Sequence, residues 1–220
     1  MRMSLPRVLL LWWCLCFNTN LQAGENPWVE MIPTFPLSGG KNDSLVPYGY
    51  YSDNRNCIGN ILNNCDVYRS FASGLLWGEP QLNKIHKIYN EGTFSTYDPL
   101  KTTCCWFYIV EGQPVGLIGF QPDFILNPPL PEIFFALKDS GQGKGLLKEG
   151  LERILPWFDR KTSRNVSLRF PLCLNYAASP SLLQTFGFLP CVTAQQEPFS
   201  ICKGNITYKI YLRPHALIDR

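Results

Sequence analysis

At residues 132–150 the chain reads Glu-Ile-Phe-Phe-Ala-Leu-Lys-Asp-Ser-Gly-Gln-Gly-Lys-Gly-Leu-Leu-Lys-Glu-Gly. This stretch predicts an apolar strand, a glycine-rich turn and then an amphipathic helix. Glycine tolerates positive φ and lets a ligand approach the backbone closely, and a helix N-terminus offers unpaired N–H groups. We therefore predict that the amides of Gly143, Lys144 and Gly145 form a cradle for a phosphate-bearing cofactor, although the same turn also occurs as plain structure.

Two common nucleotide-binding motifs do not fit this turn. The lysine is not part of a Gly-Lys-Ser/Thr element, so the Walker-type loop is missing. The glycines do not follow the Gly-x-Gly-x-x-Gly spacing of dinucleotide sites, with an acid about 20 residues further on. A different phosphate cofactor is needed.

The turn resembles the pyrophosphate loop of the GNAT superfamily of acetyl-CoA-dependent N-acetyltransferases. The family pattern Gln/Arg-x-x-Gly-x-Gly/Ala aligns with Gln142-Gly-Lys-Gly-Leu-Leu147, in which Leu147 replaces the final small residue. The stretch looks closer to the branch that acetylates the N-terminal alanines of ribosomal proteins, whose Gly-x-Gly-x-x-x-Glu spacing matches Gly143, Gly145 and Glu149.

A second block of sequence strengthens this resemblance. The family has an Asn-x-x-Ser, then a short helix that ends in Gly-Phe. Here Asn175 and Ser179 precede Gly187-Phe188. Ser179 is in register with the pattern, whereas Asn175 is one residue early.

The order of predicted elements agrees with the family. We expect strands at 105–110, 114–120, 133–137, 166–174 and 205–212, a Pro-rich connection at 121–131, and helices at 56–71, 79–89, 146–158 and 181–186. The resemblance implies an α+β protein with the GNAT-like acyl-CoA N-acyltransferase fold, in which a mixed central sheet has helices on both faces.

The resemblance also implies a cosubstrate and a site. Acetyl-CoA would lie along the backbone of Phe134 to Leu137 and on the loop, with the cofactor-binding residues Phe135, Ala136, Leu137, Gln142, Gly143, Lys144, Gly145, Leu146 and Asn175. Glu132 stands where similar enzymes have an acid that orients a water or accepts the amine proton, and an exposed strand-end residue is the alternative. Ser179 would hydrogen-bond the leaving thiolate or cap the short helix, and Leu183 replaces a tyrosine that is the general acid in many relatives.

Composition sets the domain size and limits the partners. Hydrophobic residues make up 45% of the 220 residues, which suits one domain with a substantial core. The formal net charge of +3 is mild, and no stripe of basic and aromatic residues indicates nucleic acid. Two histidines and no Cys-x-x-Cys pair give no metal site, and the oligomeric state is left open.

The N-terminus is typical of a secretory signal peptide. Residues 1–23 contain basic residues, an apolar run at 8–17 and a small residue at Ala23, and the run is short for a membrane span. Membrane association is therefore expected only through residues 8–17. We assign 24–44 to a linker or N-terminal extension and 45–220 to the acetyltransferase domain.

This leader conflicts with the cosubstrate, because acetyl-CoA is kept inside cells. The cosubstrate favours the cytoplasm and a functional leader favours export. Nine cysteines, seven of them beyond the leader, indicate either one or two disulfides or buried thiols.

Two functions follow from the sequence. The first is transfer of an acetyl group from acetyl-CoA to a primary amine, on a protein N-terminus or a small molecule, by direct attack in a ternary complex. The alternative is a secreted or membrane-associated interaction protein that retains the scaffold without catalysis, which the leader, Leu183 and the shifted Asn175 favour.

Overall fold

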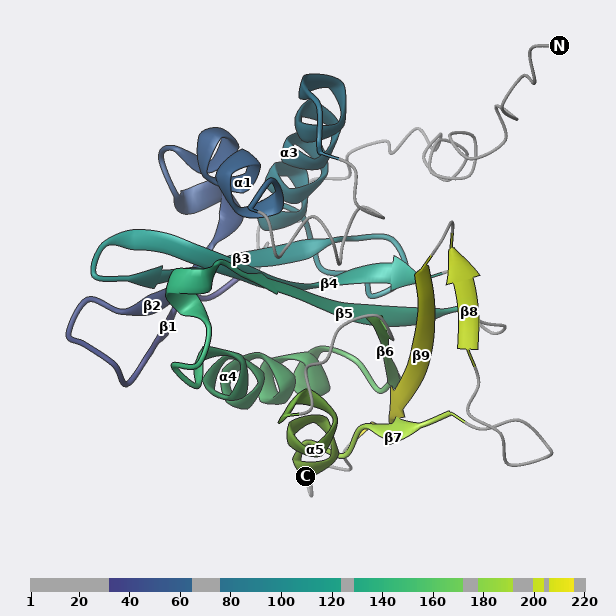
Figure 1. Cartoon of the computed structure of the whole chain (residues 1–220). Helices are drawn as coiled ribbons and strands as arrows, with labels where there is room; N and C mark the ends of the chain where they lie inside the picture. The colour runs from purple at the N-terminus through teal and green to yellow at the C-terminus, as the bar shows by residue number, and fades with distance from the viewer. Residues whose placement is uncertain are drawn as a thin grey trace, which may run out of the picture.

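The computed structural model describes residues 32–64, 76–123, 129–171, 178–191, 200–203 and 206–215. These residues form one mixed sheet of nine strands with helices on both faces (Figure 1). The predicted α+β class and the mixed central sheet are confirmed.

The strands follow the order β1-β2-β3-β4-β5-β6-β9-β7, and β8 pairs with β9. Among the described strands, β5 and β6 pair in parallel and the other pairings are antiparallel. The strands are β1 Phe35–Pro36, β2 Ser44–Pro47, β3 Cys104–Val110, β4 Gln113–Asp123, β5 Leu130–Leu137, β6 Val166–Pro171, β7 Leu189–Pro190, β8 Ser200–Lys203 and β9 Ile206–Arg213.

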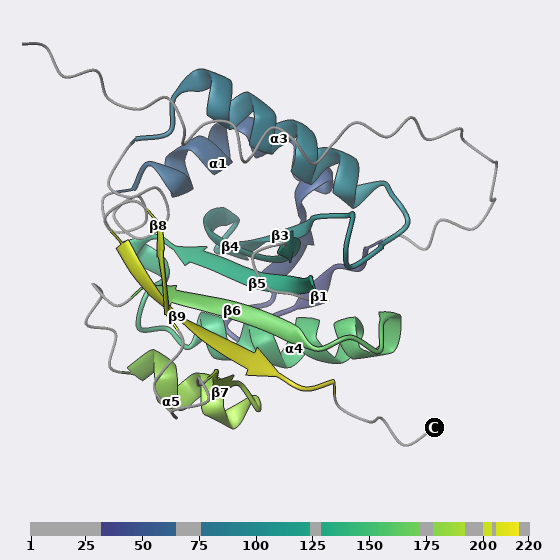
Figure 2. The ribbon, with the colours of Figure 1, turned by 90° about the vertical axis from the view of Figure 1, so that its right-hand side faces the viewer.

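Helices cover the sheet from both sides, as Figures 1 and 2 show. Helices α1 (Asn54–Leu62) and α3 (Glu79–Thr93) lie above the sheet in the view of Figure 1, and α4 (Leu146–Lys161) and α5 (Ala178–Thr185) lie below it. Each layer encloses its own apolar core. The upper core contains Ile58, Phe107 and Phe134, and the lower core contains Trp106, Ile154 and Phe188.

Most predicted elements are present, but several boundaries were wrong. The connection expected at 121–131 is shorter, because β4 continues to Asp123 and β5 begins at Leu130. Cross-strand pairing carries the chain through Pro122 and Pro131, which face each other in the ladder. Helix α1 ends at Leu62, and the expected helical residues 65–71 and strand residues 172–174 lie outside the described residues.

The segment before residue 45, expected as an extension, supplies β1 and the first residue of β2 to the sheet. β1 pairs with β2, and β2 pairs with β3 from Ser44↔Ile109 to Pro47↔Trp106. Ile32 and Leu37 are buried in the lower core. Within the described residues no helix is both long and apolar enough to span a membrane.

Candidate acyl-CoA site

The glycine-rich loop adopts the backbone that its glycines predicted. Gly143 and Gly145 have φ of +70° and +75°, in the left-handed region that favours glycine. Gly145 is the N-cap residue of α4. A Cβ atom built on either glycine meets no atom within 4 Å, so the space in front of both residues is open to a ligand.

Hydrogen bonds fasten this loop to the end of β5. The 3-10 turn η3 (Asp139–Gly141) links the strand to the loop. The Gln142 side-chain amide donates to the carbonyl oxygen of Leu137 at 3.2 Å. Gln142 therefore points back to the strand, where it holds the loop.

Charges around the loop leave it suited to an anion. Lys144 and Lys148 are exposed. The acid in the first turn of α4, Glu149, accepts a hydrogen bond from the backbone N–H of Ser38 and lies 3.9 Å from the Arg153 guanidinium. These two partners offset the negative charge, which would otherwise oppose anion binding at this helix N-terminus.

Strands β5 and β6 stop pairing before the end of β5 that leads to the glycine-rich loop. β5 pairs with β4 along its full length, from Leu130↔Asp123 to Leu137↔Gly116. With β6 it shares one ladder position, Glu132↔Ser167. Beyond Glu132, no ladder position joins the described residues of β5 to β6, so the edge of Phe135, Ala136 and Leu137 that leads to the loop has backbone groups available to a ligand.

Glu132 lies at the position where β5 is still paired with β6. Its side chain is buried, with 4% exposed, and its Oε2 accepts a hydrogen bond of 2.8 Å from the Gln121 side-chain amide. The alternative of an exposed strand-end residue is therefore wrong, because Glu132 is the third residue of β5 and is covered by protein.

The side chains of β5 alternate between the two cores. Phe134 and Ala136 belong to the core under α1 and α3, and Ile133 belongs to the core over α4. Because side chains alternate along a strand, Glu132 shares the face of Phe134 and Ala136. The ring of Tyr89, on α3, stacks on that of Phe134, with 5.6 Å between the ring centroids and 17° between the ring planes.

The Tyr89 phenol is buried. Burial raises the pKa of Tyr89 well above its ordinary value, and smaller contributions come from Cys105, Tyr48 and Glu132. Tyr89 therefore keeps its proton at neutral pH.

The remaining predicted site residues differ from the prediction in position or burial, or lie outside the described part of the chain. Ser179 lies inside the first turn of α5, because the helix begins at Ala178 and not after Ser179. The predicted helix cap is therefore wrong. Asn175 lies outside the described residues. Leu146 is buried in the lower core, so only its backbone faces the loop, and Leu183 is fully buried.

Gln121 is a site residue that sequence reasoning missed. Its partnership with Glu132 depends on the register of β4 against β5, which the two strands set by pairing Gln121 directly with Glu132. The sequence assigned Gln121 to a connection, so it contained no signal for this contact. In the described part of the chain, no group of three His, Cys, Asp or Glu residues is arranged to hold a metal ion.

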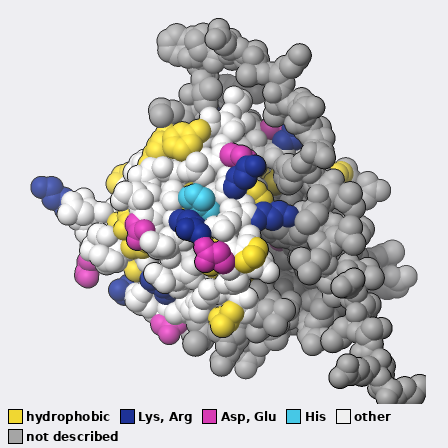
Figure 3. Space-filling view, turned by 90° about the horizontal axis from the view of Figure 1, so that it is seen from above, with side chains coloured by type: hydrophobic (Ala, Val, Ile, Leu, Met, Phe, Trp, Pro, Cys, Tyr) yellow, Lys and Arg dark blue, Asp and Glu magenta, His cyan; other side chains and the backbone are white. Residues whose placement is uncertain are grey.

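The face above the sheet carries charges of both signs. Figure 3 shows Lys and Arg side chains interspersed with Asp and Glu on this side of the molecule. Two exposed ion pairs on it are Arg55–Glu79 and Lys87–Glu91. Among the described residues on this face, charges of both signs are mixed, so they do not by themselves select a charged acceptor.

Comparison with solved structures identifies the class of fold. An acetyltransferase assigned to the GNAT family from Bordetella pertussis matches with a TM-score of 0.61 and 17% identity, over 84% of this chain and 99% of its own. An acetyltransferase from Salmonella typhimurium, solved with its cofactor acetyl-CoA, matches with a TM-score of 0.58 and 13% identity, over 80% and 96%. AAC(6')-Ib, solved with ribostamycin and coenzyme A, matches with a TM-score of 0.54 and 10% identity, over 77% and 93%.

The chain thus has the GNAT fold. No protein-family model matches the sequence, and the search of curated proteins gives no match. At these identities the likeness concerns the fold, and the activity has to be argued from the site.

Proposed function

We propose that this protein transfers an acetyl group from acetyl-CoA to a primary amine by direct attack in a ternary complex. The observation that carries the proposal is the continuity of two features. The part of β5 beyond its ladder position with β6, residues 135–137, leads directly into the glycine-rich loop. In that loop Gly143 and Gly145 have positive φ and open space around them. A thioester with a pantetheine arm and a pyrophosphate has the length and the chemistry for both.

The residues of the site divide into three roles. The backbone edge at Phe135, Ala136 and Leu137 would hold the pantetheine arm, and the loop amides of Gly143, Lys144 and Gly145 would bind the pyrophosphate. Leu146 would contribute its amide, and Gln142 would keep the loop in place through Leu137. The resemblance also keeps Asn175 as a candidate cofactor-binding residue and Ser179 as a candidate catalytic residue.

Bound acetyl-CoA supplies an activated acyl group, and the protein supplies position and a proton acceptor. The amine nitrogen forms a bond to the acyl carbon, the carbon–sulfur bond breaks, and the electron pair leaves on sulfur. Glu132 would accept the proton that the amine loses, directly or through a water. Burial raises the pKa of Tyr89, on α3 above the same face of the sheet, so its phenol stays protonated.

The acceptor is either a protein N-terminus or a small-molecule amine. The spacing of Gly143, Gly145 and Glu149 supports the branch that acts on N-terminal alanines of ribosomal proteins. In this chain Glu149 is held by Ser38 and Arg153, so it would shape the loop and not contact the acceptor.

A binding function without catalysis is the second candidate. Its support is Leu183, which is fully buried where many relatives have a tyrosine general acid. The leader at 1–23 also supports it, since export would separate the protein from acetyl-CoA. Mass spectrometry of the purified protein, for its N-terminus and for bound CoA, separates the two candidates.

The central test uses Gly145→Glu. A carboxylate among the loop amides repels the pyrophosphate and occupies its space, so we expect acetyl-CoA to lose its stabilising effect on thermal unfolding. In the parent, acetyl-CoA at 100 times its Kd should stabilise by about 2.7 kcal/mol. Lys144→Ala should reduce the effect only modestly, because the amides remain.

Gly112→Glu is the matched control. Gly112 has the same φ of +75° and equally open surroundings, but it lies in the turn between β3 and β4. Both variants should lose similar stability from the strained backbone, and only Gly145→Glu should lose the response to acetyl-CoA. An unchanged response in Gly145→Glu would refute the assignment of the loop.

A further inference from the structure

We propose that Asn165 carries an N-linked glycan, which is added when the chain enters a secretory compartment. Asn165-Val-Ser167 matches the acceptor pattern Asn-x-Ser/Thr, in which x is any residue except proline. The leader predicted at residues 1–23 would bring the chain to the compartment where such sugars are attached. The proposal goes beyond the proposed function and does not depend on the glycine-rich loop or on acetyl-CoA.

Asn165 lies on the surface, in the connection between α4 and β6. Helix α4 ends at Lys161 and β6 begins at Val166, and Asn165 is exposed between them. The next two residues, Val166 and Ser167, are fully buried. The chain therefore enters the sheet directly after Asn165, and a bulky hydrophilic sugar on Asn165 would stay outside the core.

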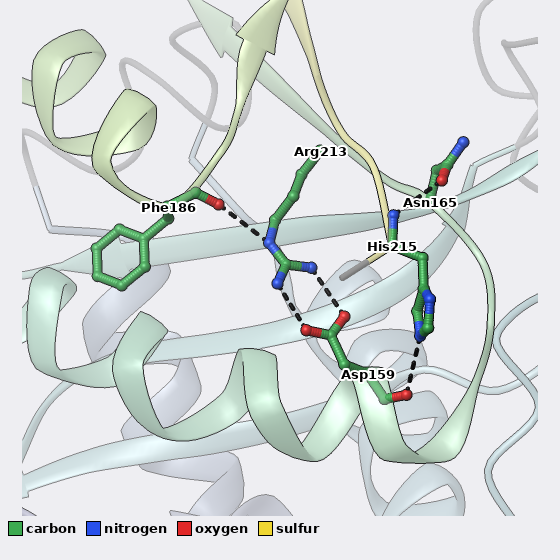
Figure 4. Close-up of polar contacts among 5 residues, drawn as sticks. All are labelled: Asp159, Asn165, Phe186, Arg213 and His215. Atoms are coloured by element: carbon green, nitrogen blue, oxygen red, sulfur yellow. Dashed lines mark hydrogen bonds and ion pairs between the residues drawn. The ribbon is translucent and has the colours of Figure 1, made fainter. Parts of the chain in front are cut away.

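A hydrogen bond orients the Asn165 amide in a way that leaves its nitrogen available. The backbone N–H of His215 lies 3.0 Å from Asn165 Oδ1. Because an N–H can only donate, the amide oxygen faces His215 and the amide nitrogen points away from it, as Figure 4 shows. The sugar is attached at Nδ2, and Oδ1 remains an acceptor afterwards. A glycan on Asn165 is thus compatible with the contact to His215.

The chemistry of transfer also says when the sugar is added. The donor is an oligosaccharide joined through a diphosphate to a membrane lipid. Asn165 Nδ2 loses a proton and bonds to the first sugar carbon, while the bond from that carbon to the diphosphate oxygen breaks and its electron pair leaves on oxygen. The Ser167 hydroxyl belongs to the acceptor pattern, but in the folded protein it is buried and donates to the carbonyl oxygen of Pro131 at 3.3 Å. Transfer therefore has to precede the folding of β6 into the sheet.

Charge favours Asn165 over the second exposed acceptor pattern, Asn42-Asp-Ser44. There the middle residue is Asp43, whose negative charge repels the diphosphate of the donor. At Asn165 the middle residue is the neutral Val166, and the preceding residue is the exposed cation Arg164. A third pattern begins at Asn205, which lies outside the described residues.

The test expresses the full chain, with its leader, in cultured mammalian cells and purifies it from the cells and from the medium. The denatured protein is treated with peptide N-glycosidase F in heavy-oxygen water, which converts each glycosylated asparagine to a labelled aspartate. Trypsin then cleaves after Arg164 and Arg169, so the peptide 165–169 reports on Asn165 alone. We expect a labelled aspartate at position 165 and a loss of mass of the intact protein on treatment.

Asn165→Asp is the main variant, because it removes the amide nitrogen and keeps an oxygen for the His215 N–H. It should lose the sugar at position 165, while its melting temperature should equal that of the parent when both are made in bacteria. Ser167→Ala, which breaks the pattern and keeps Asn165, should lose the label too. Asn60→Asp is the matched control, since Asn60 is an exposed asparagine of α1 outside any acceptor pattern. It should keep the glycan of the parent.

Three results would overturn the proposal. The first is an unlabelled peptide 165–169 in protein whose leader has been removed. The second is a chain that retains Met1 and carries no sugar. The third is a glycan on Asn42 or Asn205 with Asn165 unmodified. None of them bears on the acetyl-CoA test of Gly145→Glu, which uses protein purified from bacteria, and failure of that test leaves the glycan standing.

Discussion

Among single residues, Glu132 is the one that we propose as the proton acceptor. It is one of few buried acids in the described part of the chain, and it is held by a neutral amide at 2.8 Å. Its neighbours across the face are aromatic, with Phe134 on the same strand and Tyr89 above it.

We predict that Glu132→Gln binds acetyl-CoA as the parent does and turns over amines about 100-fold more slowly, since general-base catalysis contributes on this order. The amide keeps the shape and can still accept the bond from Gln121, but it cannot take a proton. The loss should be greatest below the pKa of the acceptor amine, where a proton must be removed before attack. Initial rates measured across that pH range test this.

Parental turnover at every pH in this variant would make Glu132 a structural residue. Proton removal would then run through water or backbone carbonyls. The acetyl-CoA response in thermal unfolding serves as the control, because it depends on the loop and not on Glu132.

At the scale of elements, the contact between α4 and β3 is unusually close. A Cβ atom on Gly150 would lie 1.9 Å from the Tyr108 hydroxyl oxygen, so this helix position accepts only glycine. The hydroxyl is buried and has no hydrogen-bond partner within the described structure. Burial and, to a lesser degree, Glu149 raise the pKa of Tyr108 well above its ordinary value, so the phenol stays neutral.

We predict that Tyr108→Phe stabilises the protein by about 1 kcal/mol, because a buried hydroxyl without a partner costs about 1–3 kcal/mol. Gly150→Ala alone should destabilise, since overpacking of about 1–3 kcal/mol exceeds the gain of about 1 kcal/mol in helix propensity. The double variant should recover part of that loss, because the nearest clashing atom is gone. Urea unfolding of the three variants and the parent measures each difference.

Purely additive changes in the free energy of unfolding would show that Tyr108 and Gly150 are not coupled. The loss in Gly150→Ala would then not come from a clash with the Tyr108 hydroxyl. Gly59→Ala in α1 is a suitable comparison. Its Cβ would lie 3.3 Å from the end of the Leu82 side chain, which can move, so the substitution should be neutral or stabilising.

Across the whole molecule, a buried ion pair joins β9 to α4, and a hydrogen bond links the same arginine to the residue after α5 (Figure 4). Arg213, at the end of β9, donates to both carboxylate oxygens of Asp159 on α4, at 2.8 and 2.6 Å. Its Nε donates to the carbonyl oxygen of Phe186 after α5, at 3.0 Å. His215 and Asn165 add contacts from the flanking segments.

We predict that Asp159→Ala lowers the free energy of unfolding by about 3–5 kcal/mol, because it leaves a buried guanidinium without its counter-charge. Glu152→Ala, on the same helix, is the control. Its ion pair with Lys148 is exposed and spans 3.8 Å, so its loss should cost no more than about 0.5 kcal/mol. Chemical unfolding at neutral pH distinguishes the two, and equal losses would contradict the structural role of the buried pair.

The sequence alone was sufficient for the periodic elements and for the loop. The hairpin of β3 and β4, the strand β5, the helix α4 and the positive φ of Gly143 and Gly145 could all be predicted. These features depend on local physics, namely the spacing of apolar residues and the steric freedom of glycine. The resemblance to the GNAT loop rests on the same local pattern, and the fold that it implied is the fold observed.

The surroundings of each site residue depend on tertiary contacts that the sequence pattern does not contain. The burial of Glu132 and its bond to Gln121 depend on the register of two strands. The pairing of β1 and β2 with the sheet and the hydrogen bond from Ser38 to Glu149 depend on contacts between distant segments. A sequence pattern contains the period of a strand but not the partner it pairs with, because pairing is chosen by the packing of the whole sheet.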